Sequence, residues 1–126
     1  MDLHAPASEI RLRDTVVHGD RVDLKRFSTA LRVTARELAS AAGISAEAAK
    51  RAERSATPTS QRGLREMMEI IDRVIPWAGS PLQAFAWYRS EALPAFGQMT
   101  PEQIVKAGHG EALRDYLDGL AVGGYA

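Results

Sequence analysis

Cysteine is absent from the 126 residues, which excludes a disulfide framework and a thiolate metal site. No apolar stretch approaches the ~20 residues that span a bilayer, and the opening segment MDLHAPASEIRLRD lacks the apolar run of a signal peptide. His4, His18 and His109 have no metal-ligand spacing, and neither a P-loop nor a His-Glu-x-x-His motif occurs. We therefore expect a cytoplasmic protein that is not an enzyme, with no metal, no cofactor and no membrane association.

The formal net charge is zero, but the charge is unevenly distributed. Residues 1–65 carry twelve Lys/Arg and eight Asp/Glu, whereas residues 66–126 carry four and eight. Thirteen of the sixteen basic residues are Arg, the side chain suited to bidentate phosphate contacts. This asymmetry is compatible with a basic surface for DNA and an acidic surface for another partner. The alternative is a chance division of solvated charges.

Helical periodicity and helix-start signals dominate the chain. Leu24, Phe27 and Leu31 share one helical face. A longer amphipathic helix is predicted to stop before Pro76, and its inward residues are Leu64, Met67, Met68, Ile71 and Ile75. The segment SATPTSQ before it is predicted to be a loop.

Two helices are predicted to start at Ser80-Pro81 and at Thr100-Pro101, each with a hydroxyl N-cap and glutamine three residues later. A last helix has Leu113, Tyr116, Leu117 and Leu120 on one face. No strand-length alternating run occurs. The predicted fold class is all-α with six or seven helices: a helix-turn-helix unit followed by a small helical domain.

The pattern divides the chain into four parts. These are an N-terminal arm (1–20) with a short ordered piece at 10–17, a helix-turn-helix region (21–62), a connecting helix (63–79) and a C-terminal domain with a free tail (80–126).

The helix-turn-helix pattern is TARELASAAGISAEAAKRAER, residues 34–54, whose last residue is Arg54. Thr34 opens a helix that Gly43 ends, and Ala39 supplies the small side chain that a tight helix crossing needs. Ile44 follows the turn and can fill the core. Ser45 caps the next helix, predicted to run from about residue 46 to 54.

One face of that helix carries side chains suited to the major groove or to phosphates. The residues predicted to contact DNA are Ser45, Glu47, Lys50, Arg51, Arg54 and Thr59. The structural alternative is a helical hairpin with a charged outer face. The inward Ala49 and Ala52 give little buried area, so specific binding would depend on dimerisation.

The aromatic residues Trp77, Phe85, Trp87 and Tyr88 fall within twelve residues. They are either core residues or, where a subset is exposed, an interface. The C-terminal tail is either a frayed end or a segment that orders on docking into a partner.

The C-terminal segment 84–126 resembles the toxin-binding domain of Xre/MbcA/ParS-type antitoxins. The resemblance is carried by the aromatic-rich helix, the LPAFG-x-x-TPE turn, the Val-x-x-Gly helix end, the Leu-x-x-Tyr-Leu helix and the terminal Gly-Gly-Tyr-Ala. With the helix-turn-helix in front, it covers most of residues 22–126. Gln98 stands where the family often has a second glycine.

The resemblance implies a bacterial type II antitoxin. Its partner would be a RES-domain toxin that degrades NAD⁺ or ADP-ribosylates a protein, and operator DNA would be a second partner. The residues that would contact the toxin are Trp87, Leu120, Val122, Gly123, Gly124, Tyr125 and Ala126. A homodimer within a larger toxin–antitoxin assembly is expected. The alternative function is a stand-alone repressor whose C-terminal helices only dimerise.

Overall fold

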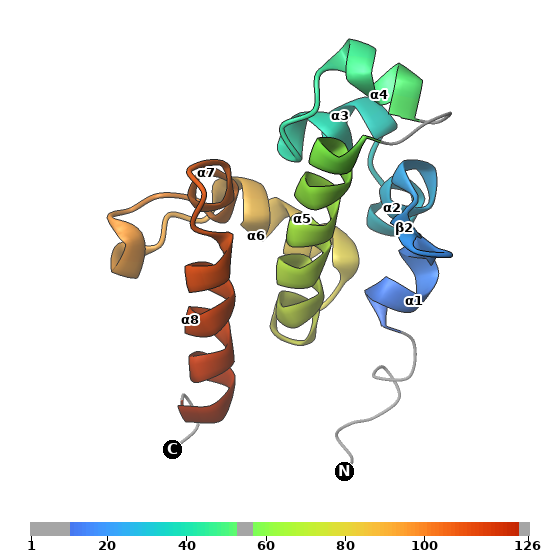
Figure 1. Cartoon of the computed structure of the whole chain (residues 1–126). Helices are drawn as coiled ribbons and strands as arrows, with labels where there is room; N and C mark the ends of the chain where they lie inside the picture. Colours follow the sequence, from blue (N-terminus) through green and yellow to red (C-terminus); the bar gives the residue numbers. More distant parts are fainter. Residues whose placement is uncertain (1–10, 53–56, 124–126) are drawn as a thin grey trace.

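The computed structural model describes residues 11–52 and 57–123, which form a mostly helical protein (Figure 1). The expected all-α class is confirmed. The elements in chain order are α1 (Leu12–Val16), β1 (Val17–His18), β2 (Arg21–Val22), α2 (Leu24–Leu31), α3 (Ala35–Ala41), α4 (Ala46–Ala52), α5 (Pro58–Ala78), α6 (Pro81–Ser90), η2 (Pro94–Phe96), α7 (Pro101–Lys106) and α8 (Gly110–Gly123).

The segment ahead of α2 is packed into the fold. Leu12 and Val16 on α1 are buried, and the two short strands pair antiparallel, with Val17 opposite Val22. The hairpin turns at Gly19, whose φ of 70° is readily available to glycine. The ordered piece predicted at 10–17 is described from residue 11 onward, since Ile10 lies outside the described residues, and it continues as a hairpin through residue 22.

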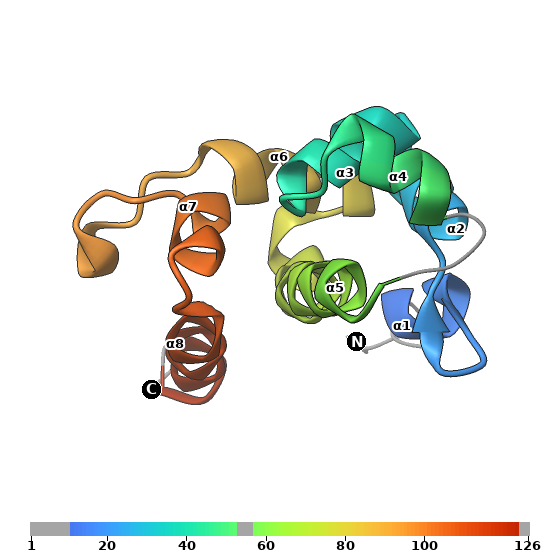
Figure 2. The same cartoon turned by 45° about the horizontal axis from the view of Figure 1, so that its top comes forward.

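The long helix α5 is the centre of the core. It lies between α1 on one side and α8 on the other, and both views show this arrangement (Figures 1 and 2). Ile70 and Val74 are buried in addition to the apolar face that the periodicity predicts, while Ile75 is only partly buried. The helix is buried on more than one face because elements from both ends of the chain pack against it.

Both ends of α5 differ from the prediction. The helix begins at Pro58, because Thr57 Oγ1 accepts a hydrogen bond from the Ser60 backbone N–H at 3.1 Å, so part of the expected loop is helical. It also continues past Pro76 to Ala78. The φ angle of proline is compatible with a helix, and proline lacks only one backbone N–H donor. The last turn of α5 is closed by Gly79 N, which donates to Ile75 O at 2.9 Å.

The other predicted caps are formed. The hydroxyls of Thr34, Ser80 and Thr100 accept from the backbone N–H three residues on, at 3.0, 3.1 and 3.1 Å. At Thr100 the Gln103 side chain completes a capping box. The last helix is longer than expected, since α8 includes Val122 and Gly123, which the prediction placed in the tail.

Candidate nucleic-acid and partner-binding surfaces

The turn between α3 and α4 has the buried side chains and the left-handed glycine that the sequence predicts for it. Ala39 and Ile44 are buried, and Ile44 N donates to Ala39 O at 2.8 Å across the turn. Gly43 has φ 78°, a left-handed conformation that glycine adopts at little cost. The turn is therefore closed by backbone bonds and filled by one aliphatic side chain.

A second glycine allows α5 to pass close to this turn. A Cβ on Gly63 would lie 2.7 Å from the carbonyl oxygen of Ala42, the C-cap residue of α3. That distance is shorter than real Cβ contacts, so α5 and the end of α3 approach each other only because residue 63 lacks a side chain.

The side chains predicted to contact DNA lie on the outer side of this unit as far as the structure describes them. Glu47, Lys50 and Arg51 are exposed on α4, and Thr59 is exposed in the first turn of α5. Ser45 is exposed, but its Oγ accepts from Ala48 N at 3.1 Å and so caps α4. Arg54 lies outside the described residues.

The inner face of α4 buries little apolar surface in the residues that the structure describes. Ala48 and Ala49 are only partly buried against the core. Two alanines contribute little apolar area, so the helix gains little stabilisation from its own packing.

The C-terminal unit is built from α6, the η2 turn, α7 and α8. Phe85 and Tyr88 are buried, which makes them core residues, whereas Trp77 is 43% exposed and Trp87 is half-buried. The Tyr88 hydroxyl is buried and has no hydrogen-bond partner among the residues that the structure describes. Burial, together with the nearby Glu102 carboxylate, raises the pKa of this phenol well above its ordinary value.

Backbone hydrogen bonds close the η2 turn, and one aromatic contact joins it to α8. Leu93 N donates to Met99 O at 3.0 Å and Gln98 N donates to Leu93 O at 2.8 Å. The Phe96 ring meets the Tyr116 ring of α8 edge-on, with the ring centroids 5.4 Å apart. Gly97 and Gln98 both have positive φ, 66° and 69°. Gln98 thus holds a conformation that glycine takes more readily.

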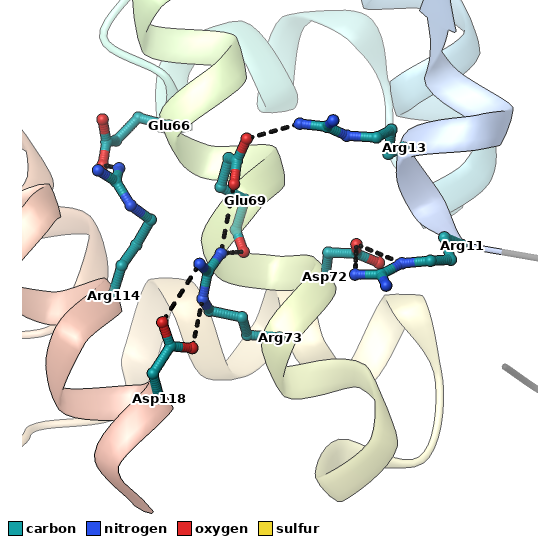
Figure 3. A network of polar contacts seen from close by, with 8 residues as sticks. All are labelled: Arg11, Arg13, Glu66, Glu69, Asp72, Arg73, Arg114 and Asp118. Atoms are coloured by element: carbon teal, nitrogen blue, oxygen red, sulfur yellow. Dashed lines mark hydrogen bonds and ion pairs between the residues drawn. The ribbon is translucent and has the colours of Figure 1, made fainter. Parts of the chain in front are cut away.

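Ion pairs join the central helix to its two neighbours (Figure 3). Towards α1, Asp72 accepts from Arg11 at 3.0 Å and Glu69 accepts from Arg13 at 2.7 Å. Towards α8, Arg73 Nε pairs with Asp118 at 2.9 Å.

A further pair on the α8 side joins Glu66 and Arg114. These exposed or half-exposed pairs orient α1 and α8 along α5 more than they stabilise the fold.

A more buried pair organises α6 and α7. Arg89 donates to both oxygens of Glu102, at 2.7 and 3.1 Å, and Lys106 Nζ donates to Glu102 at 2.6 Å. Glu102 itself is only 8% exposed. Its burial alone would raise its pKa, but the hydrogen bonds from Arg89 and Lys106 outweigh burial, so the pKa of Glu102 lies below its ordinary value.

The described residues predicted to contact a toxin come from two helices, α6 and α8. Trp87 is on α6, whereas Leu120 is 40% exposed ten residues into α8, about 15 Å along the helix axis. The other exposed residues of α8 include Glu111, Asp115 and Asp118. Gly124, Tyr125 and Ala126 lie outside the described residues.

Over residues 11–52 and 57–123, no helix is long and apolar enough to cross a membrane. The same part of the chain contains no cluster of three or more His, Asp or Glu side chains able to hold a metal ion. No protein-family model, curated protein or solved structure matches the chain significantly. The resemblance to Xre/MbcA/ParS-type antitoxins therefore rests on the motifs of this sequence alone.

Proposed function

We propose that this protein is a type II antitoxin. It neutralises a RES-domain toxin that consumes NAD⁺ or ADP-ribosylates a protein, by covering the toxin's active site with the C-terminal domain and tail. The helix-turn-helix region binds operator DNA upstream of its own genes. A homodimer supplies two such units to the DNA.

The observation that carries this proposal is the separation of the two candidate surfaces. The C-terminal end of α8, with Leu120 exposed, lies at the opposite end of the molecule from α4 (Figure 1). A partner can therefore occupy the end of α8 while the outer face of α4 remains accessible. The acidic exposed residues of α8 and the basic Lys50 and Arg51 of α4 give the two surfaces different electrostatic character.

The toxin interaction is tested by co-expression with the product of the adjacent reading frame. Leu120→Glu places a charge on the exposed surface of α8, and a central apolar contact of this kind costs about 2 kcal/mol or more when lost. For Leu120→Glu we expect weaker complex formation and loss of neutralisation. We expect the same result for a chain truncated after Asp118. Leu82→Glu is the matched control, because Leu82 is a similarly exposed leucine, at 44%, on α6.

If both the Leu120→Glu variant and the truncated chain neutralise the toxin as well as the wild type does, the end of α8 and the tail do not cover its active site. If the adjacent product is not neutralised by the wild-type chain, the antitoxin function itself is wrong.

The alternative function, a stand-alone repressor with a C-terminal dimerisation domain, is favoured by the exposed Trp77 and Leu82 at the junction of α5 and α6. A gel shift with the upstream promoter and the Arg51→Ala, Arg54→Ala variant tests DNA binding, with Arg114→Ala as the control for charge. We expect weaker binding and a shallower salt dependence than in the control. Under this alternative, Leu82→Glu would abolish the dimer, and the adjacent gene product would have no effect on DNA binding.

A further inference from the structure

Lys106, in the C-terminal unit, reaches the turn of the helix-turn-helix. Its Nζ donates to the carbonyl oxygen of Ser40 at 3.1 Å, and that carbonyl also accepts from Gly43 N at 3.1 Å. The side-chain stem lies against the turn as well, since a Cβ on Gly43 would be 3.8 Å from Lys106 Cε. A side chain 66 residues away in sequence thus contacts the turn between α3 and α4.

The Lys106 ammonium group is held in this position by a second hydrogen bond, to Glu102. Glu102 accepts from Lys106 Nζ at 2.6 Å and is itself fixed by two hydrogen bonds from Arg89. A chain of charged groups therefore runs from α6 through α7 to the C-terminal end of α3. A cation at that end also interacts favourably with the partial negative charge of the helix terminus.

The direction of α4 depends on this turn. Among the helices, α4 packs mainly on α3, and its inward Ala48 and Ala49 supply little apolar contact. With so little packing of its own, α4 takes its orientation from the backbone bonds of the turn. A group that fixes the Ser40 carbonyl therefore also fixes where Lys50 and Arg51 point.

We propose that Lys106 is a positioning residue for DNA binding: it orders the turn before α4 from within the C-terminal unit. The inference rests on the proposed operator binding and deepens it. It predicts that a residue outside the helix-turn-helix region, with no contact to DNA, controls its affinity for DNA.

The experiment compares the full-length wild type with Lys106→Met, Lys106→Arg and Arg114→Met. Arg114→Met is the matched control, because it removes one positive charge and one ion pair from the C-terminal unit without touching α3. The measurements are the Kd for a DNA fragment spanning the upstream promoter, amide hydrogen exchange at Gly43 and Ile44, and unfolding in urea.

For Lys106→Met we expect a Kd about fivefold higher than that of Arg114→Met, with Gly43 and Ile44 amides exchanging faster by a similar factor. Lys106→Met also removes one of the three hydrogen bonds to Glu102, while Arg89 keeps the other two, and unfolding in urea establishes that the variant is folded where DNA binding is measured. Lys106→Arg should restore both properties, since a guanidinium can donate to the same carbonyl.

Equal affinity and equal exchange in Lys106→Met and Arg114→Met would overturn the inference. Failure of the wild type to bind the promoter fragment would instead overturn the proposed DNA-binding function. In that case amide exchange at Gly43 and Ile44 still decides whether Lys106 orders the turn.

Discussion

Arg89 on α6 holds Glu102 on α7 through two nearly parallel hydrogen bonds, Nε to Oε1 at 2.7 Å and Nη2 to Oε2 at 3.1 Å. Two parallel hydrogen bonds are the strongest arrangement of a guanidinium with a carboxylate. They favour the charged form of Glu102, although its side chain is nearly buried. Because Lys106 extends the pair towards α3, the contact joins three helices rather than two.

The pH dependence of stability is expected to reflect this carboxylate. The pKa of Glu102 is lowered from 4.5 in the folded protein, so its stabilising contribution is present above that value. The contribution is lost as the pH falls through the lower, folded-state pKa. In urea titrations between pH 6 and pH 3, stability should fall less steeply in Glu102→Gln than in the wild type.

Glu111→Gln is the control for this titration, since Glu111 is an exposed glutamate on α8. It should retain the wild-type steepness. An identical pH profile for Glu102→Gln and the wild type would show that the Arg89 and Lys106 contacts do not act in solution.

Removal of the Tyr88 hydroxyl is expected to stabilise the fold. The hydroxyl is buried with no hydrogen-bond partner in residues 11–52 and 57–123, and such a group costs about 1–3 kcal/mol in desolvation. Tyr88→Phe should therefore raise the free energy of unfolding by about 1 kcal/mol, measured in urea. Tyr116→Phe, which preserves the edge-on ring contact with Phe96, should change it little. A destabilised Tyr88→Phe variant would mean that the hydroxyl is hydrogen-bonded in solution.

Two helical glycines should respond to alanine with opposite signs. Beyond the neighbouring backbone of α8, a Cβ on Gly119 would meet no described residue within 4 Å, so Gly119→Ala should stabilise by about 1 kcal/mol through helix propensity. Gly63→Ala should destabilise by about 1–2 kcal/mol, because its Cβ would overlap the Ala42 carbonyl. Thermal unfolding of the two variants measures both effects. The same sign in both would place α5 farther from the end of α3 than the structure has it.

The left-handed residue in the η2 turn gives a graded test. At φ 69°, Gln98 carries a steric cost of about 1–2 kcal/mol that glycine avoids and a β-branched residue increases. Unfolding free energies should rank Gln98→Gly at or above the wild type and Gln98→Val below it by about 1 kcal/mol or more. If Gln98→Val were as stable as the wild type, the backbone at residue 98 would not be left-handed.

The sequence by itself determined where many helices begin and which residues face inward. Thr34, Ser80 and Thr100 act as N-caps, and Leu24, Phe27 and Leu31 are buried together, because caps and helical faces depend on residues only three or four positions apart. At the start of α5, Thr57-Pro58 shares the hydroxyl and the proline of Thr100-Pro101 but has Ser60 instead of glutamine three residues after the cap, so the sequence signal for this helix start is weaker.

Only the tertiary structure decided which polar groups meet across the fold. Asp72 accepts a hydrogen bond from Arg11, and Lys106 donates one to the Ser40 carbonyl. The two residues of each pair are more than 60 positions apart in sequence. Such contacts depend on the packing of whole helices around α5. Periodicity and short motifs relate residues only a few positions apart, so they cannot predict a contact between residues more than 60 positions apart. Burial of Glu102 and continuation of α5 past Pro76 have the same origin, because surrounding helices can override a residue's local preference.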